Sequence, residues 1–305
     1  MNRNWRLDCD RGRFALKELA DADPATARRN LGLLDHLAEA GVPVPRAVPT
    51  AEGDTLAEID GHAYYATSWV TGEHLTGADM TSAQAEHMGE VIGRIHRALA
   101  DTRAGLPEAR RPLAPVTGPT AARAECERFL SLIAAGTEPS AFDVAASRAL
   151  HRRLELIERH AHRRPEDERP LGPYGWIHGD CQDWNLIWTG RDIGAVIDWD
   201  RVRDRPYGEE VVRAATWQFG LPDGRIDLGK VAALIAGYRT QMPIGGAALA
   251  DAARRHWWKL LSHCWHLVFH YDRDDDSCDD LFFTEGRMVA WWSDHLEEVE
   301  RVCTG

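Results

Sequence analysis

The sequence contains no run of about 18 consecutive apolar residues, the length that a membrane-spanning helix needs. Its first twenty residues carry charges where a signal peptide needs an apolar stretch, so we expect a cytoplasmic protein without a membrane partner. Internal repeats and low-complexity segments are also missing. These absences favour a globular chain, and 305 residues with 44% hydrophobic content can form one large domain or two unequal lobes.

Closely spaced cysteines and excess positive charge are also missing. The six cysteines are scattered without the C-x-x-C spacing of zinc sites and redox dithiols, so we expect reduced thiols. A formal charge of −12 argues against a nucleic-acid partner, because binding a polyphosphate requires a basic surface. An acidic surface suits a cationic or neutral small molecule, although such a surface more often serves solubility alone.

The hydrophobic pattern of the first 70 residues predicts a small, mostly antiparallel sheet with one helix. Residues 3–19 alternate apolar and polar side chains around Arg11-Gly12, which predicts a β-hairpin. Asp23-Pro24 is typical of a helix start, and Gly41 is typical of the end of that helix. Two further strands are expected, over residues 55–59 and 64–70.

The pattern becomes mostly helical after this sheet. A capping box at Thr81 opens a helix, and the chain is expected to be helical from Tyr207 nearly to its end. Two more helical stretches are expected around 121–135 and 141–162. Short strands are expected between these helical parts, over residues 176–178, 186–188 and 193–197.

Five polar side chains with the chemistry of a metal-nucleotide site lie close together in the sequence: His178, Asp180, Asn185, Asp198 and Asp200. Three of them are carboxylates that would repel one another unless a divalent cation and a phosphate-bearing substrate relieved the repulsion. Phosphoryl transfer needs one carboxylate to orient or deprotonate the accepting hydroxyl, and an amide oxygen with a second carboxylate to hold the metal. Asp180, Asn185 and Asp198 have suitable types and spacing for these roles.

Two segments carry a resemblance to a known superfamily. HGDCQDWN (178–185) and IDWD (197–200) resemble the catalytic loop and the metal segment of aminoglycoside phosphotransferases and choline kinases, distant relatives of protein kinases. The segment 31–48 also resembles type II homoserine kinases. The resemblance implies an ATP-dependent, Mg²⁺-requiring kinase acting on a small-molecule hydroxyl.

The same resemblance implies an α+β, bilobal, protein-kinase-like fold. Its parts would be a nucleotide-binding lobe over residues 1–70, a hinge near 68–72, and a larger, mostly helical lobe over 73–305. Members of the superfamily carry a further strand before the position of Asn4, so the first lobe is expected to be short at its start.

The resemblance also implies roles for single residues. Asp180 would position or deprotonate the acceptor hydroxyl, with His178 as a strut of the loop. Asn185 and Asp198 would be the metal ligands. Lys17 would bind the α and β phosphates of ATP. The remaining expected contacts with the nucleotide come from Asn4, Ser68 and Val70.

One feature of the nucleotide lobe departs from the superfamily pattern. The lysine equivalent to Lys17 usually pairs with a helical glutamate, but this helix presents Arg28, Arg29 and Asn30 at the corresponding place. The sequence therefore does not identify the partner of Lys17. It also leaves open the alternative that the protein is a pseudokinase, a binding module without catalytic turnover.

The acceptor also stays open. Candidate substrate residues are Gln182, Asp183, Asp200 and Trp265. Tryptophans near the acidic run 272–280 could bind a cationic acceptor, although helix packing and a solvated loop explain them better. The remaining alternatives are an aminoglycoside, an amino alcohol such as choline, homoserine, or the Ser or Thr of a peptide.

Overall fold

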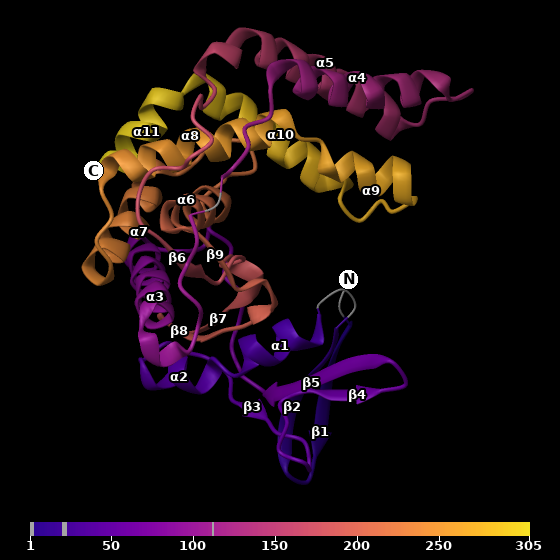
Figure 1. Ribbon diagram of the computed structural model, residues 1–305. Coiled ribbons are helices and arrows are strands. Elements are labelled where there is room, and N and C mark those ends of the chain that lie inside the picture. Colours follow the sequence, from indigo (N-terminus) through magenta and orange to yellow (C-terminus); the bar gives the residue numbers. More distant parts are fainter. Residues whose placement is uncertain (1–2, 20–22, 112) are drawn as a thin grey trace.

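The structure, a computed structural model, describes residues 3–19, 23–111 and 113–305, and it combines an antiparallel sheet with a mostly helical region (Figure 1). The sheet has the order β1-β2-β5-β3, and β4 also pairs with β5. All of these pairs are antiparallel. The strands are β1 (Arg3–Cys9), β2 (Gly12–Leu19), β3 (Ala47–Val48), β4 (Ala57–Ile59) and β5 (His62–Ser68).

The hairpin predicted over residues 3–19 is confirmed, and its register places Lys17 inside the sheet. Lys17 lies opposite Asn4 of β1 and opposite Tyr65 of β5. Its side chain is only 8% exposed. A lysine this deeply buried requires an anionic partner, since an unpaired buried ammonium is very costly.

The prediction of one helix between Asp23 and Gly41 is wrong in one respect, because the chain forms two helices there. These are α1 (Pro24–Leu31) and α2 (Leu34–Glu39). Asp23 caps α1 as expected by accepting a hydrogen bond from the backbone N–H of Thr26 at 2.9 Å. The break falls at Gly32, a poor helix former.

The helical region is built around α3 (Ser82–Ala100), which packs against α7 (Leu228–Gln241). The two backbones come so close that a Cβ at Gly89 would lie 1.9 Å from the Leu234 carbonyl oxygen. The capping box at Thr81 is confirmed. The other helices are α4 (Pro119–Ala135), α5 (Ala141–His160), α6 (Tyr207–Gln218), α8 (Gly246–Ser262), α9 (Trp265–Arg273), α10 (Asp279–Asp294) and α11 (Leu296–Thr304).

Two small antiparallel sheets lie between the first sheet and these helices. β6 (Tyr174–Ile177) pairs with β9 (Arg203–Pro206), and β7 (Leu186–Thr189) pairs with β8 (Asp192–Val196). The sequence pattern missed β9, because its Arg-Asp-Arg-Pro residues lack apolar alternation and backbone pairing alone holds the strand. The segment 178–185 connects β6 to β7 and is therefore held at both ends.

In Figure 1 the first sheet lies at one end of the molecule, and α4 and α5 lie at the opposite end. The two small sheets, α3 and α6 lie between these ends. None of the helices in the described part of the chain has the length and apolar character of a membrane span.

Candidate active site

His178 is fully buried at the start of the loop that follows β6. Its Nδ1 accepts a hydrogen bond from the Asp180 backbone N–H at 3.2 Å. With Nδ1 accepting, Nε2 carries the proton and donates to the Ile197 carbonyl at 3.1 Å. Burial lowers the pKa of His178, although the negative charges of Glu210 and Asp180 oppose that shift. The ring is thus a neutral link between the loop and the segment before Asp198.

Glu210 of α6 binds the backbone of the same loop and is 3% exposed. Its carboxylate accepts hydrogen bonds from the backbone N–H groups of His178, at 3.1 Å, and Gly179. It also bonds to His96 Nε2 of α3 at 2.8 Å, and His96 Nδ1 bonds to the Tyr238 hydroxyl of α7 at 2.9 Å. Burial would raise the pKa of Glu210, but the hydrogen bond and charge of His96 outweigh it, so the pKa is lowered and the carboxylate stays ionised.

Gly179 is required by the shape of the turn. Its φ of +85° lies in the left-handed region, and a Cβ there would lie 2.3 Å from the Arg201 carbonyl oxygen. The loop therefore packs directly against the backbone that follows Asp198.

Asp180 is positioned between two different groups. Its Oδ1 accepts a hydrogen bond from Arg213 Nη2 of α6 at 2.7 Å. The Asn185 amide donates to the Asp180 carbonyl at 2.8 Å and approaches Oδ2 at 3.3 Å. Asp180 is 8% exposed and Asn185 is 7% exposed. Both side chains are thus held in fixed orientations before any ligand binds.

Asp198 follows β8 in an unusual backbone conformation, with φ of 64°. Such left-handed non-glycine residues are uncommon and cluster at functional sites. The preceding residue, Ile197, donates its N–H to the Asn185 carbonyl at 2.9 Å, which fixes Asp198 next to the catalytic loop. Burial would raise the pKa of Asp198, but the charge and hydrogen bond of Lys17 outweigh it and lower the pKa.

Lys17 contacts two carboxylates of the segment 197–200. Its Nζ lies 2.7 Å from Asp198 Oδ1 and 2.6 Å from Asp200 Oδ2. These carboxylates are the partners that the sequence pattern left open. Tyr65 of β5 adds a long hydrogen bond to Asp200 at 3.4 Å.

Asn30 stands on α1, where the superfamily pattern predicts a glutamate, and it does not pair with Lys17. Its amide donates to the backbone carbonyls of Trp199, at 2.8 Å, and Asp200, at 3.3 Å. Arg29 binds the Val202 carbonyl at 3.2 Å, and its guanidinium lies over the Trp176 ring at 4.9 Å. Helix α1 therefore attaches the first sheet to the metal segment through neutral backbone contacts.

The candidate metal ligands are one amide and one carboxylate. Among residues 3–19, 23–111 and 113–305, no group of three or more His, Cys, Asp or Glu side chains could hold a metal ion. Mg²⁺ in nucleotide sites commonly takes one or two protein ligands together with phosphate oxygens and water. Asn185 and Asp198 fit that kind of site, because the Asn185–Ile197 backbone hydrogen bond holds the two residues together.

Comparison with known proteins decides the family. The profile of the phosphotransferase enzyme family matches residues 1–243. The chain belongs to the phosphotransferase enzyme family. A homoserine kinase of Methylobacillus flagellatus is 27% identical over 269 residues, which are 86% of this chain and 76% of that kinase.

Solved structures agree with this family at the level of the fold. The phosphotransferase superposes on spectinomycin phosphotransferase with a TM-score of 0.65 and 14% identity, covering 97% of this chain and 89% of the other. Amicoumacin kinase gives a TM-score of 0.59 and 18% identity, covering 97% and 85%. The fold is thus the predicted bilobal one.

The residues of this phosphotransferase that are expected to contact the nucleotide lie in the first sheet or directly after it. Asn4 is exposed on β1 opposite Lys17. Ser68 ends β5 and accepts a hydrogen bond from the Arg46 backbone at 3.0 Å, and Val70 follows it half-buried. The sheet therefore connects these positions to Lys17 at the edge of the metal segment.

The expected substrate residues fall into two groups. Gln182, Asp183 and Asp200 lie within or beside the catalytic loop, and burial raises the pKa of Asp183. Trp265 lies elsewhere, at the start of α9. Helix α9 lies beside α10 (Figure 1). The Trp265 ring lies against His266 and Phe269. Of the other tryptophans, Trp257, Trp258 and Trp292 are at most 2% exposed, which confirms that they pack in the core.

Sequence patterns missed three residues that shape this site: Glu210, His96 and Arg213. Glu210 was detectable in principle, because this second of two adjacent glutamates directly precedes Val211 and Val212, and a carboxylate is unusual on a buried helix face. His96 and Arg213 carried no local signal, since their contacts join α3 and α6 to a loop far away in the sequence.

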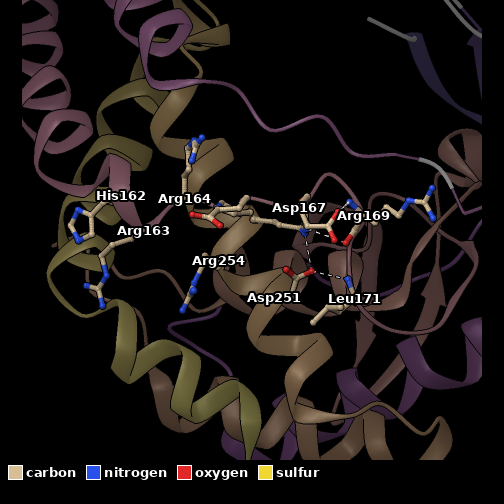
Figure 2. Close-up of a pocket in the computed structure, with 11 residues that line it drawn as sticks. His162, Arg163, Arg164, Asp167, Arg169, Leu171, Asp251 and Arg254 are labelled. Atoms are coloured by element: carbon tan, nitrogen blue, oxygen red, sulfur yellow. Dashed lines mark hydrogen bonds and ion pairs between the residues drawn. The ribbon is translucent and has the colours of Figure 1, made fainter.

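A second, arginine-rich pocket of about 350 Å³ lies apart from this site, between the end of α5 and α8 (Figure 2). Three of its arginines bind acidic side chains of the protein. Arg254 makes a two-pronged ion pair with Glu300, Arg163 lies 2.6 Å from Glu297, and Asp251 accepts hydrogen bonds from Arg255 and the Leu171 backbone. We therefore assign the pocket a structural role.

Buried neutral histidines make the stability of this phosphotransferase dependent on pH. Burial lowers the pKa of His256 and of His266 to about 3, and it lowers that of His178. Below the unfolded value of about 6.5 the unfolded chain binds protons that the folded chain does not, so stability is lost as the pH falls. Each such histidine costs up to about 1.4 kcal/mol per pH unit.

Urea unfolding at pH 7.5, 6.5 and 5.5 checks this expectation. The unfolding free energy should decrease with pH, and His256→Gln should weaken the decrease. The same substitution at the exposed His151 should not. A free energy that stays constant over this range would contradict the assignment of neutral buried rings.

Proposed function

We propose that this phosphotransferase transfers the γ-phosphoryl group of ATP, bound with Mg²⁺, to a hydroxyl group of a small molecule. The observation that carries the proposal is an unbroken chain of contacts. Lys17 pairs with Asp198, the residue before Asp198 bonds to Asn185, and Asn185 bonds to Asp180. These are the groups that phosphoryl transfer needs for the phosphates, the metal and the acceptor.

Asp180 would act on the acceptor. Its carboxylate would accept the hydroxyl proton while the acceptor oxygen forms a bond to the γ-phosphorus and the bond from that phosphorus to the bridging oxygen of ADP breaks. Because Arg213 already pairs with Oδ1 at 2.7 Å, the carboxylate is held in one orientation, so orientation contributes alongside proton transfer. The products are ADP and a phosphate monoester.

Asn185 and Asp198 would hold Mg²⁺ through their side-chain oxygens. When bound, the metal ion neutralises the charge that develops on the transferring phosphoryl group. Spectinomycin phosphotransferase was solved with ADP, and amicoumacin kinase was solved with AMP-PNP and Ca²⁺, which supports nucleotide and divalent-metal binding in this fold.

Lys17 would exchange its carboxylate partners for the phosphates of ATP. Lys17→Met should therefore raise the KM for Mg·ATP at least about tenfold, because one charge-assisted hydrogen bond contributes about 1.5–3 kcal/mol. Steady-state kinetics with varied Mg·ATP measure this. Lys259→Met, at an exposed lysine of α8, is the matched control and should leave KM unchanged. An unchanged KM in Lys17→Met would remove Lys17 from the nucleotide site.

The acceptor can be tested with purified chain, Mg·ATP and a panel of small hydroxylated compounds. The panel should contain homoserine, because a homoserine kinase is among the similar sequences, together with an amino alcohol and an aminoglycoside. Formation of a phosphate monoester that disappears in Asp198→Ala supports the proposal. Phosphate transfer to a Ser or Thr peptide alone would replace the small-molecule acceptor.

One observation favours a second candidate, a pseudokinase binding module. Asn30 replaces the expected glutamate, and Lys17 is already neutralised by Asp198 and Asp200. In that case Mg·ATP would neither be consumed nor raise the melting temperature, since a ligand that binds the folded state stabilises it.

A further inference from the structure

Three arginines from different segments converge on Asp180 and its neighbour Gly179. Arg213 of α6 binds Asp180 Oδ1 at 2.7 Å and approaches the Gly179 carbonyl at 3.3 Å. Arg203 of β9 approaches the same carbonyl at 3.5 Å. Arg201 Nε lies 4.0 Å from Asp180 Oδ2. Two guanidinium groups thus lie near the Asp180 carboxylate and a third lies at the adjacent Gly179 carbonyl, in a protein whose formal charge is −12.

This positive charge is only partly compensated. Within the described part of the chain, Arg203 Nε is buried and has no hydrogen-bond partner. Burial lowers the pKa of Arg203, Glu209 opposes that shift, and the like charges of Arg205 and Arg213 add to it. A buried hydrogen-bond donor without a partner destabilises the folded protein, and a ligand that accepts the hydrogen bond removes this cost. Guanidinium groups suit carboxylates in particular, because their planar donors match two oxygens at once.

The position of these arginines relative to Asp180 indicates which ligand they face. Asn185, the candidate metal ligand, approaches Asp180 Oδ2, whereas Arg213 binds Oδ1. The phosphate end of the site has its own cation, Lys17, on the far side of Asp198. Arg213 therefore contacts the Asp180 oxygen that Asn185 does not approach, and Arg203 lies beside it at the Gly179 carbonyl.

The geometry points to an acceptor that carries a carboxylate close to its reactive hydroxyl, bound by Arg203 and Arg213 with Arg201 at the exposed rim. This inference rests on the proposed function and narrows its acceptor to small hydroxy acids, including hydroxy amino acids. It also replaces the cationic acceptor that the acidic composition suggested, because the net charge of the surface does not describe the charge next to Asp180.

The test compares two acceptors that differ only in this group, L-homoserine and L-homoserine amide. Their binding is measured by calorimetry in the presence of Mg·AMP-PNP, and their turnover is measured with Mg·ATP. Wild type should bind the acid at least about tenfold more tightly than the amide. Arg203→Gln and Arg213→Gln should remove most of this preference while changing the affinity for the amide less than about threefold.

Two further variants are controls for misfolding and for the loss of one positive charge elsewhere in the protein. Arg201 is 63% exposed, so Arg201→Gln should fold normally and reduce the preference by a smaller factor. Arg163→Gln makes the same change in the pocket of Figure 2 and should leave the preference intact.

Each other result has a definite meaning. Equal binding and turnover of acid and amide by the wild type, or an Arg203→Gln protein that keeps the full preference for the acid, would overturn the inference. A lower kcat of Arg213→Gln with both acceptors reports on the Asp180 contact, so for this variant the binding preference is the deciding readout. Preferential binding of the acid without any transfer would overturn the proposed function and leave the carboxylate site standing.

Discussion

Asp180→Asn should lower kcat by about 10²–10⁴, the range that general acid–base groups contribute, while the KM for Mg·ATP changes little. The asparagine keeps the shape of the side chain but cannot accept the hydroxyl proton. It also removes the charge that Arg213 Nη2 contacts at 2.7 Å. Steady-state kinetics with the best acceptor of the panel measure the loss.

The matched control is Asp192→Asn, at an exposed position where β8 begins. This variant should keep the kcat of the wild type and the same melting temperature. Full activity in a correctly folded Asp180→Asn protein would exclude Asp180 as the acceptor base and would require another group to position the hydroxyl.

Glu210→Gln should destabilise the protein by about 3–5 kcal/mol, the range seen when one member of a buried, charged network is removed. The carboxylate now accepts hydrogen bonds from the backbone N–H groups of His178 and Gly179 through its two oxygens, and the glutamine NH2 group would oppose one of these two donors. It would also weaken the hydrogen bond to His96. Urea unfolding, followed by tryptophan fluorescence, measures the change.

Glu158→Gln, at an exposed site of α5, is the control for the loss of one negative charge. It should change the unfolding free energy by less than about 0.5 kcal/mol, as surface substitutions usually do. A Glu210→Gln protein as stable and as active as the wild type would show that the loop does not depend on this carboxylate.

The sequence was sufficient to predict elements whose signals are local. The hairpin that carries Lys17, the capping box at Thr81 and the loop between two short strands depend on alternation, capping and turn residues within a few positions. Even there, Gly32 divided a helix that the leucine spacing had predicted as one. The helical period of the leucines does not record a break at one residue.

Contacts between distant segments were not predictable in the same way. The Lys17 partners Asp198 and Asp200 lie 181 and 183 positions later in the chain, and contacts such as that of α1 with the metal segment bring them together. Strand β9 and the cluster of Arg201, Arg203 and Arg213 have no apolar pattern. They form because β9 pairs with β6 beside the catalytic loop.

The central claim is that the segment from His178 to Asn185, with Asp198 and Lys17, couples ATP cleavage to phosphorylation of a small-molecule hydroxyl. The most direct measurement is phosphorus NMR of purified chain with Mg·ATP and homoserine. We predict one phosphate monoester for each ADP formed, and no monoester with Asp180→Asn. No monoester from any compound of the panel, together with no thermal stabilisation by Mg·ATP, would contradict the account.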